Sequence, residues 1–206
     1  MIDKRIDTII FDFGGVLINI DYQATISAFR DLGIGNFEEL YSQAEQSNLF
    51  NDLETGQISP SYFVNQLLDH LPKGTSANQV VHAWNTMIKN VPNTSIELLL
   101  KLKGRGYKLI LLSNTNQLHI DVANVEWLKT TSEKMEELFD AVYYSHQIKM
   151  RKPSTEVFSY VCDLHTLDVQ NTLFIDDSIQ HIEGAQKIGL QTIHLKKGMN
   201  LQEIFS

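Results

Sequence analysis

The segment TIIFDFGGVL, residues 8–17, is the strongest indication of the fold of this chain. Its apolar run from Thr8 to Phe11 has the length and composition of a strand that is buried on both faces of a parallel sheet. Asp12 follows the run directly, so we expect its carboxylate at the carboxyl edge of that sheet. The paired glycines, Gly14 and Gly15, permit a tight turn and leave backbone N–H groups free to face an anion. An ordinary aspartate between a strand and a turn is the alternative interpretation.

Similar apolar runs recur along the chain and alternate with helical patterns. Further strands are predicted at Lys108–Leu112, Thr172–Ile175 and Gln191–Leu195, with a weaker one at Ala141–Tyr144. Helical patterns occupy Ser95–Lys103, Thr155–Asp163 and Ile179–Ile188. This alternation predicts the α/β class, with a Rossmann-like, doubly wound parallel sheet and right-handed crossovers. In such a sheet, ligands bind beyond the carboxyl ends of the strands.

One long interval after the first strand departs from the alternation, because it contains helical patterns and no convincing strand. The helical stretches are Gln23–Leu32, Phe37–Ser47, Pro60–His70 and Ala77–Lys89. We therefore expect two domains. Residues 1–17 and 91–206 form the α/β core, and residues 18–90 form a small helical cap inserted after the first strand.

The predicted cap carries candidate substrate contacts in the turn at residues 51–58. Glu54 or Asp52 could contact hydroxyl groups of a bound ligand there, and a polar turn between two helices is the alternative. Asn19 and Asp21 lie where the chain enters the cap. They are either hinge residues or ordinary linker residues.

The composition excludes several classes of protein. With 17 basic and 25 acidic residues the net charge is −8, which disfavours a general nucleic-acid binder but not a small phosphate ligand. No apolar stretch reaches the roughly 20 residues of a membrane span. The single cysteine, Cys162, has no internal partner and sits in a helical apolar pattern, which indicates a buried thiol in a reducing compartment. We expect a soluble, cytoplasmic protein.

Polar groups follow the later strands at the same predicted edge. Ser113 and Asn114 end the second strand and offer donors to phosphate oxygens, or else form a loop and a helix cap. Lys152 precedes a proline that can open the next helix, so its side chain can point toward the same edge of the sheet. The alternative interpretation is that Arg151 and Lys152 form a solvated basic pair. Asp176 and Asp177 follow the fourth strand, where two adjacent carboxylates would repel each other without a cation, unless they only cap a helix. Oxygen ligands of this kind favour Mg²⁺.

These strings together resemble a known family. FDFGGVL, LSNTN, MRKP and FIDDS occur in the order of the four motifs of the haloacid dehalogenase superfamily, on its phosphatase side, with a helical insert after the first. The chain looks most like bacterial sugar-phosphate phosphatases of the alpha-D-glucose-1-phosphate phosphatase type. The resemblance implies a Mg²⁺-dependent phosphatase that acts on a small phosphorylated metabolite.

The resemblance also implies a role for each matching residue. Asp12 corresponds to the nucleophile that forms an aspartyl-phosphate. Lys152 corresponds to the lysine that neutralises nucleophile and phosphate. The remaining roles are phosphate binding by Ser113 with Asn114 and Mg²⁺ binding by Asp12, Asp176, Asp177 and the backbone carbonyl of Gly14.

The chain departs from the family pattern at Gly14, where most of these phosphatases carry a second aspartate that protonates the leaving group. A good leaving group, such as the anomeric oxygen of a sugar 1-phosphate, would need less help. A 2-haloacid dehalogenase, which releases halide without a proton, and a non-catalytic phosphate-ligand binder are the alternatives. His119 is interpreted as a surface histidine, with substitution for the absent acid as its alternative. The sequence leaves open the exact substrate and the oligomeric state.

Overall fold

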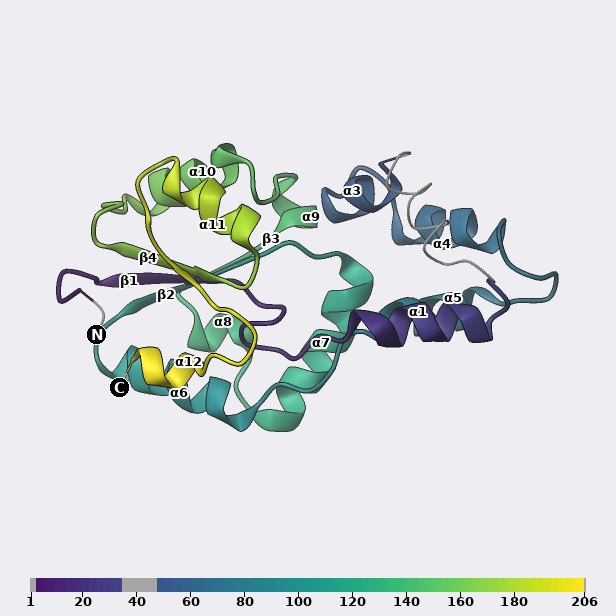
Figure 1. The fold of residues 1–206 in the computed structure, drawn as a ribbon, viewed down its shortest axis with the longest axis horizontal. Helices are drawn as coiled ribbons and strands as arrows, with labels where there is room; N and C mark the ends of the chain where they lie inside the picture. Colours follow the sequence, from purple (N-terminus) through teal and green to yellow (C-terminus); the bar gives the residue numbers. More distant parts are fainter. Residues whose placement is uncertain (1–2, 35–47, 206) are drawn as a thin grey trace.

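The computed structural model describes residues 3–34 and 48–205 and contains a five-stranded parallel sheet with the strand order β3-β2-β1-β4-β5 (Figure 1). The strands are β1 (Thr8–Phe11), β2 (Lys108–Ser113), β3 (Ala141–Tyr144), β4 (Thr172–Asp176) and β5 (Gln191–His194). Every predicted strand is therefore present, including the weak one at β3. The ends differ by one residue at three places, because β2 and β4 extend to Ser113 and Asp176, whereas β5 ends at His194.

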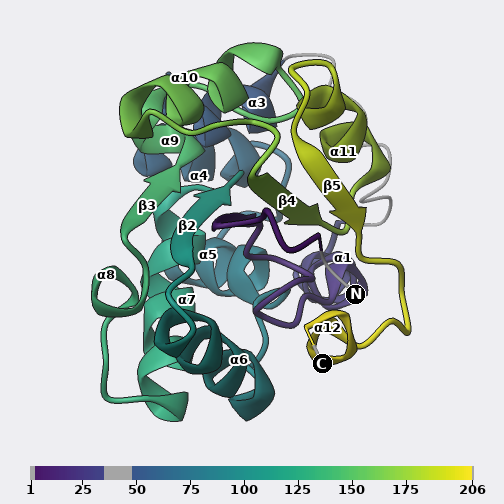
Figure 2. The same ribbon diagram turned by 90° about the vertical axis from the view of Figure 1, so that its left-hand side faces the viewer.

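Helices cover both faces of this sheet (Figures 1 and 2). One face carries α6 (Asn93–Gly104), α7 (Gln117–Thr130), α8 (Met135–Leu138) and α12 (Leu201–Ile204). The other carries α9 (Ser145–Ile148), α10 (Thr155–His165) and α11 (Ile179–Gln186). In β1, Ile9 and Phe11 pack into the core on the first face and Ile10 into the core on the second. Because successive strand residues point to opposite faces, this continuous apolar run serves both cores, and the predicted doubly wound fold is confirmed.

In the described part of the chain, four further helices gather beyond one end of the sheet around an apolar cluster of their own (Figure 1). They are α1 (Tyr22–Asp31), α3 (Leu49–Glu54), α4 (Pro60–Leu68) and α5 (Ala77–Asn85). Local caps start three of them: Asp21 accepts from the backbone of α1, Ser59 caps α4 ahead of Pro60, and Ser76 forms a capping box with Gln79. The predicted helix at Phe37–Ser47 lies outside the described residues.

The two chain segments that join these helices to the core run side by side. Ile20 and Ile88 form an antiparallel bridge, and the Lys89 backbone N–H donates to the carbonyl of Asn19 at 3.0 Å. The helix predicted to continue to Lys89 therefore ends at Asn85, since the backbone beyond it pairs with the entering segment instead. The division of the chain at residues 18 and 90 stays a prediction, as does a hinge role for Asn19.

Two predictions about the chain as a whole concern the membrane and the cysteine. Within residues 3–34 and 48–205, no helix is both long and apolar enough to cross a lipid bilayer. Cys162 is buried, as predicted, and burial raises the pKa of its thiol to about 11. The thiol is thus held in its protonated, unreactive form.

Candidate active site

The register of the sheet places Asp12 between the ends of its two neighbours. Phe11 pairs with Leu111 of β2 on one side and with Ile175 of β4 on the other. The backbone N–H of Asp12 donates to the carbonyl of Ile175 at 2.9 Å, which continues the pairing by one residue. Because all strands are parallel, the residues that end β2 and β4 meet Asp12 at the same edge, as predicted.

A fully buried lysine joins two of these acids. Nζ of Lys152 donates to Oδ1 of Asp12 and to Oδ2 of Asp176, each at 2.7 Å. Burial raises the pKa of Asp12 to about 6, against the opposing charge of Lys152, so its carboxyl is mostly ionised at neutral pH. Burial alone would lower the pKa of Lys152, but the two carboxylates outweigh it and raise the pKa, which keeps the ammonium charged.

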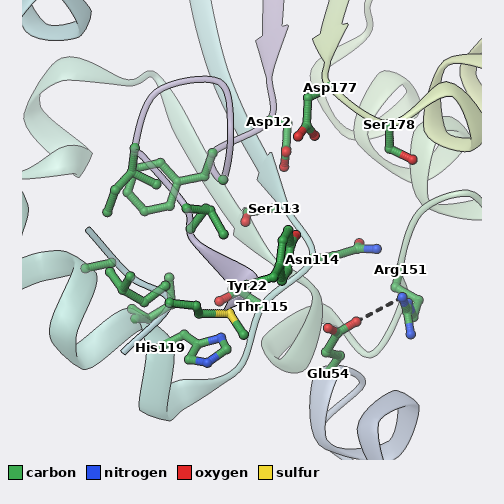
Figure 3. A pocket seen from close by; sticks show the side chains of 18 of the residues that line it. Asp12, Tyr22, Glu54, Ser113, Asn114, Thr115, His119, Arg151, Asp177 and Ser178 are labelled. Atoms are coloured by element: carbon green, nitrogen blue, oxygen red, sulfur yellow. Dashed lines mark ion pairs between the residues drawn. The ribbon is translucent and has the colours of Figure 1, made fainter. Parts of the chain in front are cut away.

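The backbone of Lys152 is held by the side chain of Asn114. Nδ2 of Asn114 donates to the Lys152 carbonyl at 2.8 Å, and Oδ1 accepts from the Lys152 N–H at 2.9 Å. The two bonds fix the point from which the lysine reaches the acids. Substrate binding by Asn114 stays a prediction, because its amide serves the lysine in this structure. Ser113, the last residue of β2, is buried and lines the same cavity as Asp12 (Figure 3).

The tandem acids after β4 have different environments. Asp176 is fully buried, and its carboxylate accepts from Lys152, from the Ser178 backbone N–H at 2.8 Å and from His181. Burial would raise the pKa of Asp176, but Lys152, with the larger effect, and His181 lower it. Asp177 is exposed and points into the cavity beside Asp12 (Figure 3). Partial burial and the charge of Asp176 raise the pKa of Asp177.

The donor set fits a hard divalent cation. Asp12, Asp176 and Asp177 each offer a carboxylate oxygen, and these oxygens lie within 4.8 Å of one another. A site made of oxygen ligands only is suited to Mg²⁺. Three carboxylates this close repel one another, which favours the binding of a cation between them. Of the three, Asp177 is the most open.

The two glycines after Asp12 differ in what they allow. Gly15 has φ +73°, and a Cβ there would clash with Oδ2 of Asp177, so glycine lets the acid approach the turn. Its N–H donates to the carbonyl of Ile18 at 2.9 Å, so the prediction of a free N–H at Gly15 that faces an anion is wrong. The turn closes on itself and consumes that donor. A Cβ at Gly14 would meet only the side chain of Ile20, at 3.3 Å.

Sequence reasoning missed His181, which lies in the first turn of α11 and lines the cavity. Its Nδ1 is 3.0 Å from Oδ1 and 2.9 Å from Oδ2 of Asp176. The sequence contains a signal for this contact. His181 is five residues after Asp176 and lies in the first turn of the helix that begins just after β4, so its side chain can reach back to the carboxyl end of β4.

The cavity has a volume of about 450 Å³ and a lining of mixed polarity (Figure 3). Its apolar lining residues include Ile20, Phe50, Trp84, Met87, Ile88 and Ile120. The lining also includes Glu54, which forms an ion pair with Arg151 at 3.0 Å between Oε2 and Nη2. Burial raises the pKa of Glu54, and the charge of Arg151 opposes this shift.

His119 also lines the cavity and is buried, so its interpretation as a surface histidine is wrong. Its ring stacks on Trp84 with a centroid separation of 5.0 Å, and Nε2 lies 3.3 Å from the carbonyl of Trp84. Nδ1 lies 3.1 Å from the amide nitrogen of Asn116. Burial lowers the pKa of His119 to about 4, so the ring is neutral at pH 7. A neutral ring with both nitrogens engaged ties the helical insert to α7.

Residues 9–195 match the family described as haloacid dehalogenase-like hydrolases. The chain belongs to this family. The predicted membership of this family is thus confirmed. The prediction that the chain lies on the phosphatase side of the family agrees with two curated relatives of this hydrolase, both named as phosphatases. D-ribitol-5-phosphate phosphatase of Bacteroides thetaiotaomicron is 28% identical over 199 residues, which cover 96% of each chain. A sesquiterpene phosphatase of Aspergillus oryzae is 26% identical, over 90% of this hydrolase and 88% of the relative.

Solved structures give the same assignment. A haloacid dehalogenase family enzyme of Bacteroides thetaiotaomicron, in complex with magnesium and inorganic phosphate, has a TM-score of 0.90 and 34% identity, over 98% of this hydrolase and 100% of that chain. A HAD-like hydrolase of Porphyromonas gingivalis has a TM-score of 0.86 and 30% identity, over 98% and 97% of the two chains. A dehalogenase at 20% identity, with a TM-score of 0.65, shares the fold alone.

Proposed function

We propose that this hydrolase is a Mg²⁺-dependent phosphatase that acts on a small phosphorylated metabolite through an aspartyl-phosphate. The observation that carries the proposal is the convergence of Asp12, Asp176 and Asp177 on one cation-sized space, with Lys152 bonded to two of them. A curated relative is a D-ribitol-5-phosphate phosphatase, and a structural neighbour holds magnesium with phosphate. We propose a sugar or sugar-alcohol phosphate as substrate, with sugar 1-phosphates among the candidates.

In the first step, a carboxylate oxygen of Asp12 attacks phosphorus, the bond to the ester oxygen breaks, and this oxygen leaves with the electron pair and takes up a proton from water. A carboxylate that attacks a phosphate dianion meets repulsion, which the buried ammonium of Lys152 reduces. Ser113 holds a phosphate oxygen through its hydroxyl, and Asn114 positions Lys152 through its backbone. Water then hydrolyses the acyl-phosphate and regenerates Asp12.

Asp12, Asp176, Asp177 and the carbonyl of Gly14 would hold the Mg²⁺ of this enzyme. When bound, Mg²⁺ supplies positive charge that offsets the repulsion between nucleophile and phosphate. Residues 18–90 act as a cap that covers the cavity and excludes water during the reaction. Three of the apolar residues that line the cavity, Trp84, Met87 and Ile88, belong to this cap.

The direct test of this function is phosphate release from a panel of phosphorylated metabolites, with and without Mg²⁺. We expect release from at least one sugar or sugar-alcohol phosphate with Mg²⁺, and its loss when EDTA removes the cation. Readdition of Mg²⁺ should restore the rate. Release that persists unchanged in EDTA, or no release from any ester, would refute the assignment.

The missing side-chain acid at Gly14 gives a second prediction. Gly14→Asp is expected to raise kcat on glycerol 3-phosphate, a poor leaving group, by about tenfold or more, since general acid catalysis contributes roughly 10²–10⁴-fold. The rate on p-nitrophenyl phosphate, which needs no proton, should change little. The backbone accepts the change, because Gly14 lies outside the left-handed region and a Cβ there meets only Ile20.

Steady-state kinetics of the wild type, Gly14→Asp and Gly14→Asn on both esters check this prediction. The asparagine variant has similar bulk without an acid and is expected to match the wild type on both. An equal gain of Gly14→Asp on both esters would mean that the acid is not what the wild type lacks.

A further inference from the structure

The lining of the cavity includes an ion pair between Arg151 of the α/β core and Glu54 of the proposed cap. Arg151 directly precedes the buried Lys152, and Glu54 is the last residue of α3. Besides its 3.0 Å contact with Glu54, Arg151 donates from Nη1 to Oδ1 of Asn51 at 3.3 Å. Figure 3 shows the guanidinium and the carboxylate facing each other at the cavity.

The pair is held by charge more than by a directed hydrogen bond. Oε2 of Glu54 is enclosed and accepts no hydrogen bond from the described residues, although the guanidinium of Arg151 is 3.0 Å away. The side chains of Arg151 and Glu54 are only 33% and 27% exposed. In a partly buried place the field of each charge is weakly screened, so the presence of Glu54 decides whether Arg151 offers a net positive charge to the cavity.

The rest of the cavity has little with which to compensate a second anion. Among the described residues that line it, Arg151 is the single lysine or arginine. His181 is committed to Asp176. The other lining residues include neutral polar side chains, such as those of Ser113 and Thr115, and the neutral ring of His119, and none of these carries a positive charge.

We propose that the Glu54–Arg151 pair makes this site selective for phosphate monoesters whose leaving group is uncharged, and that it rejects esters carrying a carboxylate or a second phosphate. This inference rests on the proposed phosphatase function and narrows its substrate class. A carboxylate on the leaving group would lose its hydration, find Arg151 already neutralised and lie near Glu54. An uncharged polyol meets no such penalty, and its hydroxyls can donate to Glu54 or accept from Arg151.

The test compares glycerol 3-phosphate with 3-phosphoglycerate, which are similar in size and differ by a hydroxymethyl group against a carboxylate. We expect the wild type with Mg²⁺ to favour glycerol 3-phosphate in kcat/KM by about tenfold or more, which corresponds to one modest charge interaction. Glu54→Gln frees the charge of Arg151 and should move that ratio about tenfold toward 3-phosphoglycerate. Glu54→Gln combined with Arg151→Gln should cancel the gain. Glu97→Gln, the same change of charge at an exposed position on α6, should leave the ratio unchanged.

Binding of the same two esters, measured by calorimetry with Mg²⁺, gives a readout that does not depend on turnover. Equal use or equal binding of both esters by the wild type would overturn the selectivity. A Glu54→Gln variant that weakens both esters alike, with no change in their ratio, would also overturn it. Selective binding by the wild type that Glu54→Gln relaxes, without any phosphate release, would support the selectivity and refute the phosphatase.

Discussion

Asp12→Asn is expected to abolish phosphate release, with a loss in kcat of at least about 10³-fold, as for other removed nucleophiles. The amide keeps the shape of the carboxylate but cannot attack phosphorus. Its oxygen can still accept from Lys152, so the hydrogen bond that now joins Lys152 to Asp12 has a substitute. Release of inorganic phosphate from the best ester of the panel, measured over hours with Mg²⁺, checks this.

The same variant separates an enzyme from a protein that only binds phosphate esters. Circular dichroism and calorimetric binding of inorganic phosphate with Mg²⁺ serve as controls for folding and for the intact pocket. An Asp12→Asn protein that binds phosphate and turns over no ester supports the nucleophile. Equal phosphate release by both proteins would assign the measured activity to a contaminant and favour the binder.

Lys152→Met is expected to lower both activity and stability. Methionine is close to lysine in length, but it leaves Asp12 and Asp176 facing each other in the interior with no ammonium between them. Removal of one partner from a buried ionic group costs about 3–5 kcal/mol of unfolding free energy. Urea denaturation at pH 7 without Mg²⁺ should therefore show a clearly lower midpoint, together with loss of phosphate release.

Two comparisons make this result specific to the buried charges. Lys197→Met, at an exposed position, should stay within about 0.5 kcal/mol of the wild type. Lys152→Met combined with Asp176→Asn should recover part of the lost stability, because one of the uncompensated charges is gone. If Lys152→Met unfolds at the same urea concentration as Lys197→Met, Lys152 does not neutralise these acids.

Much of the fold was predictable from the sequence because local pattern and strand geometry agree. The apolar runs at Thr8, Lys108 and Thr172 all form strands of one parallel sheet. Parallel strands bring their carboxyl ends to one edge, so Asp12 and the acids at Asp176 were expected together before any distance was known. The alternation of residue types was enough for this step.

Local pattern failed where a partner distant in the sequence redirects the chain or occupies a polar group. The helix expected through Lys89 stops at Asn85 because the backbone there pairs with the segment entering the helical insert. The N–H of Gly15 closes its own turn instead of facing an anion. Both outcomes depend on which hydrogen-bond partner comes closest, which a single-residue preference does not encode.

The class of fold, the edge of the sheet at which the chemistry lies and the kinds of side chain that gather there can all be read from the amino-acid order, since each follows from the period of apolar residues and the direction of the strands. Three pairings become visible in the folded chain alone: Lys152 bonds to both acids, Asn114 holds the Lys152 backbone, and Arg151 faces Glu54 from another part of the chain. Such pairings are set by packing between distant elements to within a few tenths of an ångström, and only the folded chain fixes those distances.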